Sequence, residues 1–550
     1  MKKNRHKSLQ AIAAISILGV ILALNAPNNK YFEIAKNLDI FASLFKEVNA
    51  FYVDEVDPKK TIEMGINAML SSLDPYTNYI PEEDAADFRT LTTGEYAGIG
   101  SLIGIIDEKI IITMPNEGFP AEKAGIKIGD EIIKVDTTLV KGKSTADVSS
   151  LLKGKPGTTV NLEILRNGKI KHFAITRSTI ILENVPYFGL VNKNIGYIKL
   201  TDFTTNAGKD VNDALIALKS QGAESIILDV RENPGGLLFE AVNICNVFIP
   251  KGNLVVETRG KQEDWTQQYK TLSQPTDTKI PLVVLTSSGS ASASEIVSGT
   301  LQDYDRAVLI GRKTYGKGLV QTTRPLPYNA QVKVTTAKYY IPSGRCIQAI
   351  DYSHRNPDGS AGKIADSLMI AFKTKKGRTV YDGGGVTPDI KTEAQYLAPI
   401  TISLLSKALI FNYANQYFYQ HPSIPEIKQF SLTETEYNAF ISWLGNKKYD
   451  YTTRLEEAIK QLETNEENDP MVEKIKVKLD ILKREVAHNK EKDLQTHKEE
   501  IKNLLEEEIA GRYYFTKGEI ACSIQHDSDV KEAIALLNNP IKYNQLLEVN

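Results

Sequence analysis

The sequence is poor in histidine and cysteine, and its charges nearly balance. Of its seven histidines, none lies between residues 173 and 353, so a Ser-His-Asp triad is excluded there unless a distant histidine folds in. The three cysteines lie far apart and leave one unpaired, which predicts no disulfide framework. With no CxxC or HExxH spacing, no metal or other cofactor is predicted. A net charge of −2 gives no electrostatic case for binding nucleic acid.

Long apolar runs are also scarce, and the one that stands out is at the N-terminus. The basic string MKKNRHK precedes the apolar stretch Leu9–Leu24. This pattern predicts an export signal. Leu24 and Pro27 make a poor cleavage site around Ala26, which favours an uncleaved anchor, although the run is short for a full span. We expect residues 1–27 to be a signal peptide or membrane anchor and the rest of the chain to be exported.

A chain of 550 residues is too long for one core, so several domains are expected. Hydrophobic periodicity and glycine-rich turns divide it into an N-terminal helical segment, a compact β-rich module, an α/β core in which strands alternate with helices, and a helical extension. Within the core, residues 351–378 are polar and predict a loop. In the extension, TRLEEAIKQLE and VEKIKVKLDILKREV repeat apolar residues at spacings of three and four, which favours solvated amphipathic helices over a dedicated coiled coil. The expected bounds are 28–90, 91–178, 179–392 and 393–550.

Two strand-end loops in the α/β core carry candidate chemistry. RENPGG (Arg231–Gly236) and GSASASE (Gly289–Glu295) each follow an apolar strand and precede a helix. Such loops face the same edge of a parallel sheet, where α/β proteins build their sites. The first could hold an oxyanion on backbone amides or be a tight turn. The serines of the second could include a nucleophile or cap a helix. The residues alone leave both choices open.

A serine nucleophile needs a base, and lysine is the alternative to histidine here. Lys317 lies between Gly316 and Gly318, which leave room for a partner to approach. If Lys317–Thr322 is extended, Lys317 and Gln321 lie on one face, so Gln321 could orient the amine. The amine must be neutral to act, which requires a pKa lowered by burial.

Taken together, these strings resemble the carboxyl-terminal processing peptidases, also called tail-specific proteases. RENPGG, SASASEIVSGTLQDYDRAVLIGRKTYGKGLVQ, YYIPSGRCIQ and GGGVTPD stand in the family's order. LDPYTNY and GIGSLIG…PAEKAGIKIGDEI resemble its N-terminal segment and PDZ domain. The resemblance covers roughly residues 35–392, and residues 393–550 are similar to the extension of longer bacterial members. It implies an α/β fold: a crotonase/Clp-protease-like core with an inserted β-rich PDZ domain.

The resemblance also assigns roles to individual residues. The family's nucleophile stands 25 residues before its lysine, which selects Ser292 here, with Lys317 as base and Gln321 as supporting residue. The remaining assignments are capping and packing for Ser290 and Ser294, a first-turn helix charge for Glu295, oxyanion-hole amides for Ala293 and for Gly235 or Gly236, and substrate-carboxylate amides for Gly98, Ile99 and Gly100.

We therefore expect a serine endopeptidase that cleaves protein substrates near their C-terminus through an acyl-enzyme, with the free tail captured by the PDZ domain. Its expected location is the periplasm, with anchorage in the inner membrane, and a homo-oligomer is left open. One alternative is a non-catalytic PDZ scaffold with the same core, against which the intact Ser292 and Lys317 argue. The other is a crotonase-like acyl-CoA enzyme, in which a tail-binding PDZ domain would be idle.

Overall fold

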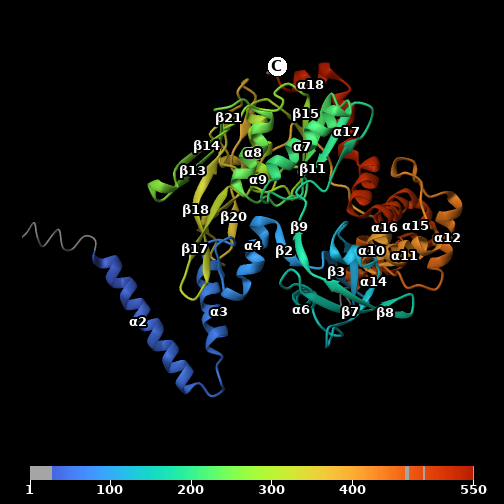
Figure 1. Cartoon of the computed structure of the whole chain (residues 1–550), viewed down its shortest axis with the longest axis horizontal. Coiled ribbons are helices and arrows are strands. Elements are labelled where there is room, and N and C mark those ends of the chain that lie inside the picture. Colours follow the sequence, from blue (N-terminus) through green and yellow to red (C-terminus); the bar gives the residue numbers. More distant parts are fainter. Residues whose placement is uncertain (1–27, 465–469, 487–489, 549–550) are drawn as a thin grey trace, which may run out of the picture. The chain divides into compact units, whose positions relative to one another are not determined.

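The computed structural model describes residues 28–464, 470–486 and 490–548 (Figure 1). The expected export segment, residues 1–27, lies outside this range. In the described part, no helix has both the length and the apolar character needed to cross a bilayer. The chain divides into two units, Met1–Tyr79 and Ile80–Asn550.

The first unit contains α2 (Asn28–Phe51) and α3 (Pro58–Ser71). Helix α3 begins after Asp57, whose carboxylate accepts a hydrogen bond from the N–H of Lys60, and proline occupies its first position. Short helices were predicted here. Helix α2 is longer than expected, with 24 residues.

The β-rich module is an antiparallel sheet that packs against helix α6. Its strands follow the order β3-β4-β5-β7-β8, so β3 lies at one end of that order. Ser144 caps the start of helix α6 and forms a capping box with Asp147. Val148 and Leu152 of this helix are buried in the module's core. Short strands β2 and β9 pair with each other where the chain enters and leaves the module. The bounds are α4 (Ala85–Thr93), β2 (Glu95–Gly98), β3 (Ser101–Ile106), β4 (Lys109–Pro115), α5 (Pro120–Lys123), β5 (Glu131–Val135), β6 (Thr138–Leu139), α6 (Thr145–Leu152), β7 (Thr159–Arg166), β8 (Lys169–Thr176) and β9 (Ser178–Ile181).

The α/β core is a six-stranded sheet in the order β10-β11-β12-β15-β16-β23, parallel except for β10. Every residue of β12, β15 and β16 is buried, which explains their continuous apolar sequences. Helices α7, α8 and α9 share one hydrophobic cluster with one face of this sheet. The predicted α/β core is therefore confirmed. The bounds are β10 (Tyr187–Leu190), β11 (Ile195–Lys199), α7 (Ala207–Ser220), β12 (Ser225–Asp229), α8 (Leu238–Phe248), β15 (Leu282–Thr286), α9 (Ala293–Asp303), β16 (Val308–Gly311) and β23 (Ile390–Lys391).

The C-terminal helices α17 (Ser528–Leu537) and α18 (Pro540–Leu546) cover the opposite face of the same sheet. Val530, Ala533 and Leu536 of α17 join a buried cluster with residues of β12, β15 and β16. The hydroxyl of Tyr543 in α18 accepts a hydrogen bond from the N–H of Leu282 at 2.9 Å and donates to its carbonyl oxygen at 3.1 Å. The end of the extension thus supplies the second helical layer of the α/β core.

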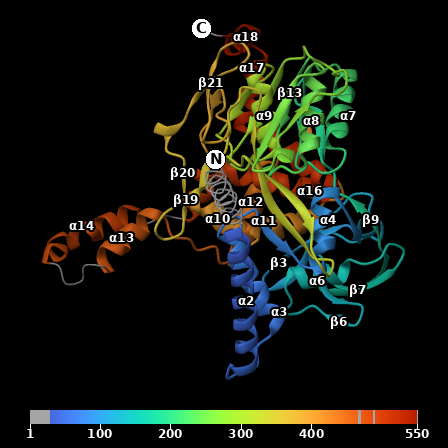
Figure 2. The same cartoon turned by 90° about the vertical axis from the view of Figure 1, so that its left-hand side faces the viewer.

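The other helices of the extension form a separate apolar cluster. Figures 1 and 2 show α10, α11, α12 and α16 side by side, and their apolar residues are buried together. Helix α16 is kinked at Phe515, where φ is 54°. The bounds are α10 (Pro399–Ser406), α11 (Leu409–Gln420), α12 (Glu434–Leu444), α13 (Arg454–Thr464), α14 (Pro470–Val486), α15 (Lys490–Thr496) and α16 (Lys498–His526).

A second, antiparallel sheet lies beside the α/β core, with β18 paired to both β17 and β13, and β13 paired to β14. The predicted loop over residues 351–378 is wrong in part, because β19 pairs with β20 and β21 begins a further pair with β22. These strands of three to six residues are too short and too polar to show a period in the sequence. The bounds are β13 (Leu254–Gly260), β14 (Gln267–Lys270), β17 (Leu319–Pro325), β18 (Gln331–Tyr340), β19 (Ile350–Arg355), β20 (Ala361–Lys363), β21 (Ala371–Lys373) and β22 (Thr379–Tyr381).

Candidate active site

The two strand-end loops lie against each other at the carboxyl edge of the sheet, as predicted. Strands β12 and β15 are parallel neighbours, so the loops that follow them meet. The carbonyl oxygen of Asn233 accepts hydrogen bonds from the N–H of Ala291 at 3.0 Å and from the hydroxyl of Ser294 at 2.9 Å. The hydroxyl of Ser290 donates to the carbonyl oxygen of Val230 at 2.8 Å. Backbone and serine contacts therefore join the RENPGG loop to the GSASASE loop.

The three serines of GSASASE have different surroundings. Ser290 and Ser294 are fully buried, and both hydroxyls donate to backbone carbonyls. Ser292 is only half-buried and stands directly before α9. Its φ of 53° and ψ of −112° lie in a region that a residue with a side chain rarely adopts, at a typical cost of about 1–3 kcal/mol. The fold therefore holds Ser292 in a strained turn between strand and helix.

Gly235 packs directly on this turn. A Cβ atom at Gly235 would lie 2.6 Å from the carbonyl oxygen of Ala291 and 2.7 Å from the backbone nitrogen of Ala293, and its φ is 93°. Only glycine allows this approach. Its own N–H donates to Oδ1 of Asn233 at 2.9 Å. Gly235 and Ala293, two of the predicted oxyanion-hole residues, are thus neighbours, and the N–H of Gly235 is already bonded to the Asn233 side chain.

Glu295 is more than the first-turn helix charge that we expected. It is fully buried, and its Oε2 accepts hydrogen bonds from the N–H groups of Ser292 and Lys317, each at 2.9 Å. Its Oε1 accepts from the N–H of Gly316 at 2.8 Å and from the hydroxyl of Thr314. Burial raises the pKa of Glu295 to about 7, although the four hydrogen bonds act in the opposite direction.

Lys317 lies just before strand β17, which begins at Leu319. The predicted extended segment Lys317–Thr322 therefore starts two residues too early. The reason is that the N–H of Lys317 bonds to Glu295, and the N–H of Gly318 bonds to Oε1 of Gln348 at 2.7 Å, so neither joins the ladder. Lys317 is half-buried.

Tyr339 of β18 makes a second link between the predicted nucleophile and base. Its hydroxyl lies 2.6 Å from the carbonyl oxygen of Lys317 and 3.1 Å from that of Ser292. The backbones of Ser292 and Lys317 thus bond to the same two side chains, those of Glu295 and Tyr339. Residues 25 apart in sequence are thereby held next to one another.

Gln321 lies within β17, and its side-chain amide donates to the hydroxyl of Thr335 at 3.1 Å. The pairing of β17 with β18 shifts register between Val320 and Gln321. The predicted role of Gln321 as a residue that orients the amine of Lys317 stays a prediction.

The predicted tail-binding residues line a groove in the β-rich module. A cavity of about 450 Å³ lies between β3 and α6, and Gly98, Ile99 and Gly100 are among the residues that line it. Gly100 has a φ of 73°, and a Cβ there would lie 2.6 Å from that of Phe119. Because β3 is at the end of the strand order, its outer edge is the place where a further strand could pair.

Sequence reasoning missed Tyr339 and the full role of Glu295. The position of Glu295, three residues after Ser292, is that of the acidic residue in a capping box, which signals a bond to the backbone before a helix. Tyr339 has no local signal, because it reaches the site from a different strand.

Comparisons with known proteins agree with this organisation. The model of peptidase family S41 matches residues 194–358, a PDZ domain model matches 86–176, and the model described as the C-terminal helical domain of a probable PDZ-protease matches 400–537. A carboxy-terminal-processing protease of Bartonella bacilliformis is 37% identical over 345 residues, which are 62% of this chain and 78% of that protein.

Other relatives carry the same description. The carboxy-terminal processing protease CtpA of Bacillus subtilis is 37% identical over 305 residues, 55% of this chain and 65% of that protein. Among solved structures, the photosystem II D1 C-terminal processing protease is 27% identical and covers 64% of this chain and 92% of its own, with a TM-score of 0.35. The match to the Bartonella protein over most of its length, and the three domain matches in order, place this chain among the carboxy-terminal processing proteases of peptidase family S41, which are serine-type peptidases.

Proposed function

We propose that the protein is an endopeptidase that works through a Ser292–Lys317 dyad and an acyl-enzyme. The observation that carries the proposal is the environment of Ser292. It alone of the three serines is accessible, and its backbone shares the Glu295 carboxylate and the Tyr339 hydroxyl with Lys317. A nucleophile and its base need such mutual positioning.

The proposed reaction steps follow from the positions of Ser292 and Lys317. The neutral amine of Lys317 takes the proton of the Ser292 hydroxyl as Oγ attacks the carbonyl carbon of the scissile peptide. The oxyanion is held by the N–H groups of Ala293 and Gly236. The C–N bond then breaks, the proton passes from Lys317 to the leaving amine, and an ester on Ser292 remains. Water, deprotonated by Lys317, hydrolyses this ester and restores the hydroxyl.

The groove between β3 and α6 is proposed to capture the substrate's C-terminal tail. The tail would pair with the outer edge of β3 as an added strand, and its carboxylate would meet the amides of Gly98, Ile99 and Gly100 in the groove lining. A peptide with an amidated C-terminus should then show a markedly higher KM than the free acid. Equal KM values for the two peptides would refute this role.

Residues 1–27 are proposed to export the protein and anchor it in the inner membrane, facing the periplasm, since they join a basic cluster to an apolar run. Fractionation of cells that make the full chain tests this. Recovery in the cytoplasmic fraction would contradict it.

The dyad is tested by comparing serine and lysine variants on a tailed peptide. Ser292→Ala should abolish cleavage and labelling by a serine-reactive fluorophosphonate. Ser290→Ala and Ser294→Ala serve as matched controls and should keep a substantial fraction of activity. Lys317→Arg keeps the positive charge but cannot deprotonate, so it should be as inactive as Lys317→Ala. Cleavage by Ser292→Ala, or near wild-type rates in Lys317→Arg, would disprove the mechanism.

A further inference from the structure

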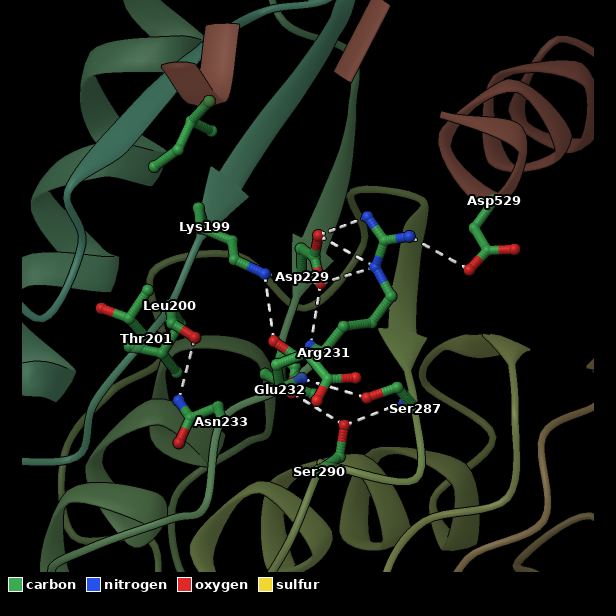
Figure 3. A network of polar contacts seen from close by, with 12 residues as sticks. Lys199, Leu200, Thr201, Asp229, Arg231, Glu232, Asn233, Ser287, Ser290 and Asp529 are labelled. Carbon is green, nitrogen blue, oxygen red and sulfur yellow. Dashed lines mark hydrogen bonds and ion pairs between the residues drawn. The ribbon is translucent and has the colours of Figure 1, made fainter. Parts of the chain in front are cut away.

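Arg231, the first residue of the RENPGG loop, joins the catalytic core to the C-terminal extension. Its guanidinium donates to the carboxylate of Asp229 at the end of β12, with distances of 2.7 to 3.1 Å. On its other side it donates to Asp527 at 3.1 Å and to Asp529 at 3.0 Å. Figure 3 shows the guanidinium between the carboxylates of Asp229 and Asp529. The two outer carboxylates lie almost 300 residues away in sequence.

The carboxylates of this contact are held firmly. Asp527 caps α17 and accepts hydrogen bonds from the N–H groups of Asp529 and Val530. Helix α17 is itself fixed on the sheet by its buried apolar face. Asp229 is fully buried, and although burial alone would raise its pKa, the charges of Arg231 and Lys199 hold that pKa well below its ordinary value. Arg231 thus forms ion pairs with carboxylates of both the core and the extension.

The backbone of Arg231 is held at the same point. Its N–H donates to Asp229 at 2.8 Å, and its carbonyl oxygen accepts from the amine of Lys199 at 3.0 Å (Figure 3). Two residues later, the side chain of Asn233 donates to the carbonyl oxygen of Leu200 at 2.9 Å and accepts the N–H of Gly235. The start of α17, Arg231 and Asn233 are therefore linked, by these contacts and by the two intervening chain bonds, to the N–H of Gly235.

We propose that Arg231, Asp527 and Asp529 are positioning residues of the peptidase site. The carboxylates at the start of α17 hold Arg231, and Arg231 fixes the path of Glu232–Gly236, so that the Gly236 amide faces the oxyanion beside Ala293. This inference rests on the proposed function, which makes that amide part of the oxyanion hole. It also assigns a role to the end of the extension: it completes the catalytic loop as well as covering the sheet.

The test is the double variant Asp527→Asn/Asp529→Asn, which removes both charges. Asparagine caps a helix as well as aspartate does, so α17 keeps its first turn. The matched control is Tyr543→Phe, which removes a contact between the extension and the same sheet at Leu282, the opposite end of β15 from the loop. Both proteins are measured for kcat, KM, thermal unfolding temperature and hydrogen exchange of the loop amides.

We expect the double variant to lose at least tenfold in kcat with KM changed less than twofold, because tail capture is separate from the loop. Exchange at the amides of Glu232 and Gly235 should accelerate by a similar factor. Tyr543→Phe should lower only the unfolding temperature. Arg231→Lys, which keeps the charge but loses the planar fork, should show an intermediate loss of kcat.

The proposal is wrong if kcat falls equally in the double variant and in Tyr543→Phe at matched loss of unfolding temperature, or if kcat and loop exchange are unchanged in the double variant. Failure of the proposed function gives a different result. The wild-type chain would then leave tailed peptides uncut, or Ser292→Ala would cut them, while the exchange rates of the loop amides would still report whether α17 holds the loop.

Discussion

Replacing Tyr339 by phenylalanine is the sharpest single test of how the fold positions Lys317. The change removes only the hydroxyl, and the ring, which is 1% exposed, keeps its packing. The carbonyl oxygen of Ser292 still accepts from the N–H groups of Glu295 and Ile296 at 2.9 Å each. The carbonyl oxygen of Lys317 instead loses its 2.6 Å donor.

The expected cost follows from that loss. Removing a hydroxyl that donates to a largely buried carbonyl costs about 1–2 kcal/mol. The same amount appears in the barrier to catalysis if the lost bond held the Lys317 backbone in its reactive position. Because about 1.4 kcal/mol corresponds to a factor of ten, kcat should fall roughly 5- to 30-fold.

Tyr304→Phe is the matched control. Its hydroxyl donates to the carbonyl oxygen of Leu254 at 2.8 Å, so this variant also loses a tyrosine-to-carbonyl bond, but away from Lys317. Both variants should unfold at lower temperatures than the wild type. Only Tyr339→Phe should lose kcat on a tailed peptide, with KM little changed. Equal kcat values for the two variants would show that Tyr339 stabilises the fold without positioning the base.

Two further variants test the carboxylate of Glu507 in α16 and the contact between Gly235 and the Ser292 turn. Burial, followed by the neighbouring carboxylates of Glu519 and Glu508, raises the pKa of Glu507 from 4.5 to about 7, so the folded state binds an extra proton and stability is lost as pH rises from about 4.5 through 7. Glu507→Gln should therefore stabilise the protein by up to about 3 kcal/mol at pH 8 and leave it unchanged at pH 4, as measured by denaturant unfolding; no gain at pH 8 would contradict the assigned cause. Gly235→Ala should lower kcat more than 100-fold, because its Cβ would lie 2.6 Å from the Ala291 carbonyl oxygen and displace the Ser292 turn; a fully active variant would show that the two loops do not need this contact.

Much of the fold was readable from local sequence. The helix predicted near residues 145–152 is α6, and the strands IGYIKL, SIILDV and PLVVLT became β11, β12 and β15 of a parallel sheet. These elements have strong periods and clear turn residues, which act within a few residues of each other. The same local patterns predicted that the RENPGG and GSASASE loops lie at one edge of the sheet, since neighbouring parallel strands end together.

The residues that contact the candidate site from distant parts of the sequence could be identified only in the tertiary structure. Nothing near Arg231 in the sequence points to Asp527 and Asp529, and nothing near Lys317 points to Tyr339. An amphipathic pattern shows that α17 must bury one face, but it does not name the sheet on which that face lies. Neighbours along the chain therefore allow prediction of the helices and strands and of the candidate catalytic residues. The charges and hydroxyls that hold the RENPGG and GSASASE loops come from elements far away in the sequence. Only the packing of those elements in the tertiary structure brings them to the loops.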